Sequence, residues 1–285
     1  MYRDMRDVEV LFDSDSYLPG DTVTATVRVT TDKAFKCNRI VARVLGEVYV
    51  TVVRGAGKHR HTYREHLEIL REHVVLSEAT NINPGTYDYP FTFTIPQTAP
   101  CSYYRYRAEV TYTVNATVEV SWAIDPKAEA LFYVRPTYPV LTPRSQVLPL
   151  TLDDRRTVIE INLPSDVLSP NAPLVIRHMI KMGEPKLRAL RFELYLKEDR
   201  VARGKSDTRT ILLDKKEVPA EDLSYTTWRE VYLQPEPRTV VELKTPILSV
   251  SYFLKVTADI PWRFDETLEV PLRAGIVEQQ ADAEF

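Results

Sequence analysis

Stretches in which apolar and polar residues alternate run through the whole chain. Residues 22–29, for example, place Val and Ala on one face and Thr and Arg on the other. Successive side chains of a β-strand point to opposite faces, so this pattern is typical of half-buried antiparallel strands. Turns rich in Pro, Gly and Asn separate such runs, which predicts an all-β protein built of sandwiches or barrels. The other alternating runs are 90–95, 109–114, 192–197 and 248–256.

One segment, residues 61–76, fits two patterns. Leu67, Leu70 and Val74 fall at helical spacing, whereas alternate residues over 63–71 could equally form one face of a strand. Because the segments around it are β, we predict a strand here. We therefore expect α-helix in under about a tenth of the residues, well below the usual third.

The alternation also predicts which side chains form the cores. The apolar members of each run should point inwards, and they are large enough to fill a sandwich. In the first half of the chain these are Val23, Val27, Val44, Phe91, Phe93 and Val110. In the second half they are Ile161, Leu194, Val250, Tyr252 and Leu254.

The two halves of the chain resemble each other in the spacing of their turns and strands. Pro96 lies 16 residues before Tyr112, and Pro237 lies 15 residues before Tyr252. Both tyrosines stand in the middle of an alternating run. Since Greek-key sandwiches share such spacings in general, the pattern indicates two sandwiches more firmly than it indicates a duplication.

A proline-rich segment, residues 135–143, separates the halves. Proline stiffens a linker, and a chain of 285 residues is long enough for two ordinary domains. We predict two tandem immunoglobulin-like β-sandwich domains, residues 1–138 and residues 139–285.

Composition and charge narrow the classes of function. The 37 basic and 40 acidic residues give a net charge of −3, and neither half is basic, so nucleic acid is not an expected partner. No apolar stretch is long enough for a transmembrane helix, and the first residues lack a signal-peptide core. These features predict a cytoplasmic protein. Cys37 and Cys101 are too few for a disulfide scaffold, and each is expected to be a small buried side chain.

Enzymatic motifs are not found in the sequence. The eight glycines form neither G-x-G-x-x-G nor a phosphate-binding loop, residues 55–58 being the nearest approach, and no G-x-S-x-G is present. We therefore expect no enzyme and no cofactor. Four histidines cluster at His59, His61, His66 and His73. Their spacing lacks a zinc-enzyme motif and no cysteine lies among them, so an exposed polar hairpin is favoured over a metal site.

Basic residues surround the glycine loop at 55–57. Arg54, Lys58, Arg60 and Arg64 stand between two strand-like runs, 48–53 and 63–69, so a hairpin would place them at or near an exposed tip. Arg forks onto two oxygens and Lys supplies a point charge, so the group could bind a phosphate or a carboxylate. The alternative is a solvated loop whose charge keeps the sheet edge from aggregating.

A second basic stretch alternates with tyrosines. Tyr104 and Tyr106 would share one face of a strand, and Arg105 and Arg107 the other. This predicts an aromatic core face and a basic solvent face.

Three segments together resemble the arrestin superfamily. Residues 83–96, NPGTYDYPFTFTIP, followed by APCS, resemble the signature of the arrestin amino-terminal domain. Residues 17–23, YLPGDTV, resemble its opening turn, and residues 271–276, PLRAGI, resemble the end of the carboxy-terminal domain. The order and spacing of these motifs cover nearly the whole chain. The resemblance implies the arrestin fold, two β-sandwiches in tandem.

Within the superfamily the chain is more similar to α-arrestins than to receptor-coupled arrestins, because the segment before Pro84 lacks a cationic amphipathic helix. The chain also resembles the arrestin-fold retromer subunit and the sporulation-control proteins. No Pro-Pro dipeptide occurs, so the Pro-Pro-x-Tyr motifs of α-arrestins are missing. The chain ends ten residues after Gly275, so we expect no long tail for clathrin or adaptor binding.

The resemblance implies a non-enzymatic adaptor or scaffold that binds proteins, in membrane-cargo trafficking or signalling. Partners would dock on sheet edges or concave faces, and membrane association would at most be peripheral, through a partner. Receptor-coupled arrestins read phosphorylated tails with basic residues of this domain, which gives the four basic residues near the glycine loop a role. A structural or regulatory protein of the sporulation-control type and a small ligand- or metal-binding module remain alternatives. The oligomeric state stays open.

Overall fold

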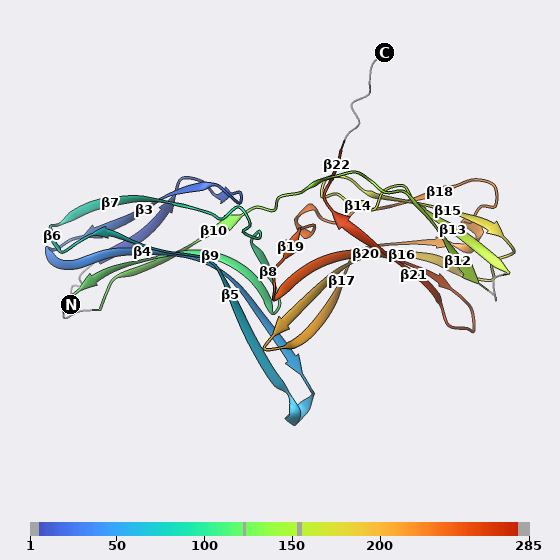
Figure 1. Cartoon of the computed structure of the whole chain (residues 1–285), viewed down its shortest axis with the longest axis horizontal. Coiled ribbons are helices and arrows are strands. Elements are labelled where there is room, and N and C mark those ends of the chain that lie inside the picture. The colour runs from blue at the N-terminus through green and yellow to red at the C-terminus, as the bar shows by residue number, and fades with distance from the viewer. Residues whose placement is uncertain (1–5, 122–123, 153–155, 279–285) are drawn as a thin grey trace, which may run out of the picture. The chain divides into compact units, whose positions relative to one another are not determined.

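The computed structural model describes residues 6–121, 124–152 and 156–278. Over these residues the chain is built of β-strands, with three short 3-10 turns and no α-helix (Figure 1). The prediction of an all-β protein is confirmed, and so is the strand over 61–76. The chain forms two compact units, and the main division falls between Thr137 and Tyr138, with 200–207 and 244–248 grouped with unit 1.

Unit 1 is a sandwich of a three-stranded sheet, in the order β1-β3-β7, and a larger sheet, in the order β2-β10-β9-β4-β5. In the larger sheet β6 adds to β4, and β8 adds to β9. The pairs are antiparallel except for the short parallel pair of β2 with β10. The strands are β1 (Arg6–Phe12), β2 (Ser16–Tyr17), β3 (Thr22–Thr31), β4 (Phe35–Arg54), β5 (His61–Ser77), β6 (Thr80–Ile82), β7 (Gly85–Thr94), β8 (Tyr103–Arg105), β9 (Ala108–Val120) and β10 (Lys127–Val134).

An aromatic cluster fills the centre of unit 1. The ring of Phe132 lies 5.5 Å from Phe12, 6.0 Å from Tyr17, 5.4 Å from Phe93 and 5.5 Å from Tyr112, measured between ring centroids. The tilted and edge-on geometry of these rings is the arrangement that aromatic pairs favour. All six residues predicted for this core are buried.

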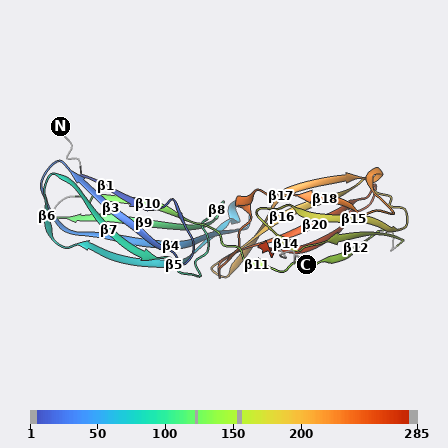
Figure 2. The same cartoon turned by 90° about the horizontal axis from the view of Figure 1, so that it is seen from above.

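Unit 2 is a second sandwich. Its sheets have the orders β12-β13-β15-β18 and β14-β21-β20-β16-β17, with β19 on β20, and β11 pairs with β22 as a separate parallel pair. Within each unit the strands run side by side along its length (Figure 2). The strands are β11 (Val140–Leu141), β12 (Gln146–Leu152), β13 (Thr157–Leu163), β14 (Val167–Leu168), β15 (Leu174–Met182), β16 (Ala189–Ala202), β17 (Lys205–Pro219), β18 (Arg229–Leu233), β19 (Leu243–Lys244), β20 (Leu248–Asp259), β21 (Glu266–Ala274) and β22 (Ile276–Val277).

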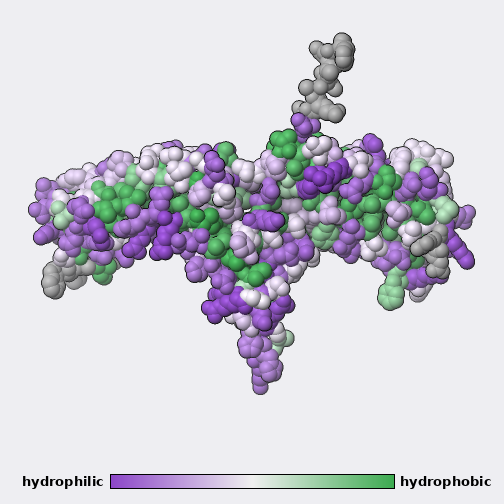
Figure 3. Space-filling model, in the orientation of Figure 1, coloured by the Kyte–Doolittle hydropathy of each residue, from purple (hydrophilic) through white to green (hydrophobic). Residues whose placement is uncertain are grey.

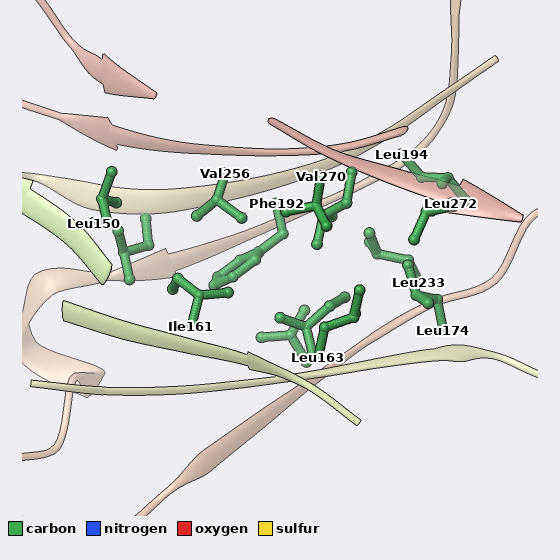
Figure 4. Packing of buried hydrophobic residues seen from close by; sticks show 14 of the residues in the cluster. Leu150, Ile161, Leu163, Leu174, Phe192, Leu194, Leu233, Val256, Val270 and Leu272 are labelled. Carbon is green, nitrogen blue, oxygen red and sulfur yellow. The ribbon is translucent and has the colours of Figure 1, made fainter. Parts of the chain in front are cut away.

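The core of unit 2 is aliphatic. Side chains from both sheets point toward one another around Phe192 (Figure 4). Four of the five residues predicted for this core are buried, namely Ile161, Leu194, Tyr252 and Leu254. Val250 is only partly buried and packs against the edge of the cluster.

The two sandwiches follow one plan. In each, a two-residue strand pairs in parallel with a late strand, β2 with β10 and β14 with β21. In each, a buried tyrosine anchors the chain upstream. The Tyr112 hydroxyl donates to the Pro100 carbonyl at 2.6 Å, and the Tyr252 hydroxyl donates to the Thr239 carbonyl at 2.9 Å. In each half the accepting carbonyl lies between the proline and the tyrosine whose spacing the sequence repeats.

The prediction that Tyr104 and Tyr106 form an aromatic core face is wrong. Their side chains are 80% and 65% exposed, and the buried ring is that of Tyr103. A tight turn at Tyr106 and Arg107 joins β8 to β9, and Arg107 has a φ of 70°. The turn interrupts the alternation, so residues 104–107 do not form the single strand that the sequence analysis assumed.

Unit 2 holds a buried histidine in β15. His178 is 1% exposed, and its ring lies 5.6 Å from that of Phe192. Burial, with a smaller contribution from the charge of Arg229, lowers the pKa of His178 to about 4. The imidazole is therefore neutral in the folded protein at neutral pH.

Replacing Phe132 by Ala is expected to lower the free energy of unfolding by ~3–5 kcal/mol, because the cavity is lined by four rings that cannot all close over it. Denaturant titration measures this loss. The control is Leu131→Ala on the same strand, where the side chain is 68% exposed and the change should stay within ~0.5 kcal/mol. Similar losses for the two variants would show that the cluster is not the centre of the core.

The free energy of unfolding should also fall because of His178 as the pH is lowered from about 6.5 to about 4. The unfolded imidazole, near its ordinary pKa of 6.5, binds a proton in this range while the folded one does not. The contribution of His178 to the free energy of unfolding is complete above the pKa of the unfolded imidazole. It is lost as the pH falls toward the pKa of the folded imidazole, at up to about 1.4 kcal/mol per pH unit. Unfolding of the chain and of a His178→Leu variant, measured from pH 7 to pH 4.5, tests this. Parallel curves for the two proteins would contradict it.

Candidate functional site

The predicted basic loop lies at the end of the β4–β5 hairpin of unit 1. The two strands pair from Ile40 and Ser77 at the base to Arg54 and His61 at the tip. The neighbouring strand β9 pairs with β4 only as far as Val50, so the last residues of the hairpin form a two-stranded ribbon. Figure 1 shows this ribbon projecting from the strands of unit 1.

The turn at the tip depends on glycine. Gly55 has a φ of 78°, and a Cβ at this position would collide with the carbonyl oxygen of His59. The residues Gly57–His59 form a 3-10 turn, in which the Arg60 amide donates to the Gly57 carbonyl at 3.3 Å. Since Gly tolerates a positive φ at little cost, these glycines build the hairpin turn and not a phosphate-binding loop.

The structure separates the four candidate basic residues into a group of three and a single residue. Lys58 lies in the 3-10 turn, Arg60 follows it, and Arg54 is the last residue of β4. All residues from 54 to 62 are exposed, and the end of the hairpin is hydrophilic (Figure 3). We call Arg54, Lys58 and Arg60 the basic tip. Arg64 is exposed as well but stands farther down the ribbon.

Arg54 and Arg64 occupy opposite faces of the ribbon. Arg64 pairs with Thr51, which is three residues from Arg54 on the same strand, and no bulge interrupts β4 between the two. Residues an odd number apart on a strand point to opposite faces. The four candidates therefore do not form one patch.

The histidine cluster is spread along the hairpin. His59 lies in the turn, His61 pairs with Arg54, and His73 pairs with Arg43. The ring of His66 stacks on Tyr49 at 5.9 Å, which gives it a packing role. Across the described parts of the chain, no three His, Cys, Asp or Glu side chains come together as metal ligands.

The outer side of the hairpin is an edge of the larger sheet. β5 ends the strand order, so along its outer side no strand of the described residues adds to that sheet. Its exposed residues carry mixed charges, and Arg71 pairs with Glu68 at 3.0 Å. Such charges hinder edge-to-edge aggregation, while the unpaired backbone can still accept a partner strand.

The two thiols are buried, as the sequence analysis expects. Cys37 is fully buried and Cys101 is 3% exposed. Burial raises the pKa of the Cys101 thiol to about 11. Because the thiolate is the reactive form, Cys101 is a poor nucleophile at neutral pH.

Two exposed aromatic residues in unit 2 were not singled out by the sequence analysis. Trp262 and Phe264, in the turn between β20 and β21, are 99% and 97% exposed. The sequence signal is a Trp and a Phe placed in a turn that follows an alternating strand, where polar residues are usual.

Relatives of the chain are found among arrestin-domain proteins. Residues 8–140 match the family model described as "Arrestin (or S-antigen), N-terminal domain". Arrestin domain-containing protein A of Dictyostelium discoideum is 24% identical over 140 residues, which are 42% of this chain and 24% of that protein. The match thus spans about a quarter of the length of this relative.

Among solved structures, Spo0M, a sporulation control protein from Bacillus subtilis, aligns with a TM-score of 0.37 and 17% identity. The alignment covers 61% of this chain and 79% of that one. Among the residues that the structure describes, no helix has the length and apolar character needed to cross a membrane. Residues 8–140 are therefore similar to the arrestin N-terminal domain, and the described residues form an all-β fold of two sandwiches.

Proposed function

We propose that this protein is a non-enzymatic, cytoplasmic adaptor that binds other proteins, in membrane-cargo trafficking or signalling. The support is the match of residues 8–140 to the arrestin N-terminal domain, because proteins of that family generally bind protein partners. We also propose that residues 1–138 and 139–285 are its two domains, without a cofactor. The sheet edge at β5 is a candidate docking surface beside the tip of the hairpin.

Within this role, the basic tip binds an anionic segment of a partner, either acidic or phosphorylated. The observation that carries this proposal is the exposure of Arg54, Lys58 and Arg60 at the end of a paired ribbon. None of the three side chains is buried in a core, so the fold does not require their charge. A guanidinium forms two parallel hydrogen bonds to a carboxylate or phosphate, which suits a charged peptide.

Substitution of Arg54, Lys58 and Arg60 by Ala should weaken binding of an anionic peptide about tenfold, since each exposed charge pair contributes ~0.2–1 kcal/mol. The probes are a labelled phosphoserine peptide, its unphosphorylated form and an acidic peptide, measured by fluorescence anisotropy. Binding should also weaken as salt rises, because exposed charges are screened over ~10 Å at 0.1 M salt.

The matched control is the triple variant Lys127→Ala, Lys216→Ala and Lys244→Ala, which removes the same charge from exposed positions elsewhere. Both triple variants should melt at nearly the temperature of the unchanged chain. Equal loss of affinity in the two would mean that only net charge matters, and unchanged affinity in the tip variant would leave the charges a protective role at the sheet edge.

A further inference from the structure

A hollow of about 610 Å³ lies at the rim of the unit 2 core, where β15, the start of β18 and residues 218–226 meet. Its volume is within the range of small-molecule sites, roughly 300–1,000 Å³. One wall is apolar, because Val218 and Leu223 line the hollow and pack against the core cluster. We call it the β15 hollow.

His178 reaches the hollow from the inner face of β15. Ile176 and Ile180, two residues away on either side, are buried as well, so the three side chains share the face that points into the sandwich. The imidazole packs on the ring of Phe192 at 5.6 Å. Its Nδ1 is buried and has no hydrogen-bond partner among the described residues. Leaving a buried polar atom unpaired is unfavourable, so a ligand that pairs with Nδ1 supplies a bond that the fold does not.

Arg229 brings a positive charge to the same side of the sheet. It lies directly opposite His178 in the antiparallel register of β15 and β18, and side chains of directly opposed residues share one face. Burial, and after it the charge of Arg229, lowers the pKa of His178 to about 4, as expected for close neighbours. Arg229 itself is exposed and forms no ion pair with a described residue. Its guanidinium is therefore available to an anionic group.

Two carboxylates line the hollow from the 3-10 turn Ala220–Asp222. Glu221 and Asp222 are exposed, and neither side chain forms an ion pair or a hydrogen bond with a described residue. The backbone that follows the turn is tied to β15, because the Ile180 amide donates to the Ser224 carbonyl at 2.8 Å. The fold thus presents two unpaired negative charges at the hollow on a segment whose backbone is held.

The third acidic residue of the hollow is already neutralised. Glu230 lies opposite Arg177 in the register and forms an ion pair with it at 2.9 Å, on the outer face of the sheet. One positive and two negative charges therefore remain for a ligand, beside a neutral imidazole. A ligand with a single charge would be attracted by one side of the hollow and repelled by the other.

We propose that the β15 hollow binds a small zwitterion, a free molecule with one carboxylate and one ammonium group at the ends of a short carbon chain. The guanidinium of Arg229 binds the carboxylate through two parallel hydrogen bonds, and the His178 ring donates a third when its N–H is on Nδ1. The two carboxylates of the 3-10 turn bind the ammonium group, and the apolar wall contacts the carbon chain. This inference goes beyond the proposed adaptor function and does not depend on the basic tip.

The probe that tests the proposal is ε-aminocaproate, and caproate and hexylamine are analogues that each keep one of its two charges. Binding is followed by NMR of the full chain with isotope-labelled histidine. Of the five histidines, four lie in the hairpin of unit 1, so the His178 signal is the one that remains when those four are replaced by Gln. This signal should shift with ε-aminocaproate, with a dissociation constant of about 1 mM. Each analogue should bind about tenfold more weakly, since it loses the hydrogen bonds of one charged end.

Two variants assign the ends of the ligand. Arg229→Gln should weaken binding of ε-aminocaproate and of caproate about tenfold and should not weaken that of hexylamine. The double variant Glu221→Gln and Asp222→Asn should weaken binding of ε-aminocaproate and of hexylamine and should not weaken that of caproate. All three side chains are exposed, so both variants should melt at nearly the temperature of the unchanged chain.

Matched controls remove the same charges from other exposed positions of unit 2. Arg238→Gln is the control for the arginine, and the pair Glu236→Gln and Glu242→Gln is the control for the carboxylates. Both should bind ε-aminocaproate as the unchanged chain does. The Ala variant of the basic tip should do so too, which separates a failure of this proposal from a failure of the adaptor proposal.

The proposal is overturned if ε-aminocaproate at about 50 mM, far above a millimolar dissociation constant, leaves the His178 signal in place. It is also overturned if caproate or hexylamine binds as tightly as ε-aminocaproate, because the hollow would then recognise a single charge. Equal loss of affinity in the variants and in their matched controls would reduce the effect to net charge and would overturn it as well.

Discussion

Strand β4 needs hydrogen-bonding partners for the backbone along both of its sides, and the larger sheet of unit 1 provides them by placing β4 between β9 and β5. β9 pairs with one side of β4 as far as Val50, and β5 pairs with the other side from Ile40 to Arg54. Beyond Val50 the strand continues with β5 as its partner in the sheet, and the chain turns back at Gly55. An inner strand of the sheet thus becomes one arm of an exposed ribbon. The basic tip is placed by backbone pairing and not by the packing of its own side chains.

Much of the fold could be predicted from alternation, because alternation is what a half-buried strand requires. Each alternating run that the sequence showed lies in a strand, apart from Ile95, the last residue of the run 90–95, and the ambiguous segment at 61–76 is within β5. The prediction is wrong at Tyr104, because Tyr103 is the core-facing residue of β8, and it is wrong at Tyr106, because this residue lies in the turn that ends the alternation. The alternating pattern does not reveal where β8 ends, and the two-residue turn at Tyr106 and Arg107 was therefore not predicted.

The candidate site was predicted in part. The hairpin, its glycines and its exposed charges follow from local sequence, since a turn between two alternating runs is a local event. The register of β4 against β5 does not follow from local sequence. This register places Arg54 and Arg64 on opposite faces of the ribbon. Trp262 and Phe264 were missed for a different reason, because the alternation of β20 ends before them and exposure in a turn leaves no periodic pattern.

The separation of Arg54 and Arg64 constrains how a peptide could lie on the hairpin. An extended strand that runs along one face of the ribbon reaches only one of the two arginines. A segment that contacts both must pass around the end, over Lys58 and Arg60. Such a path curves tightly, so chain stiffness would enter recognition alongside charge. Flexible anionic segments would follow it more readily than stiff, proline-rich ones of equal charge.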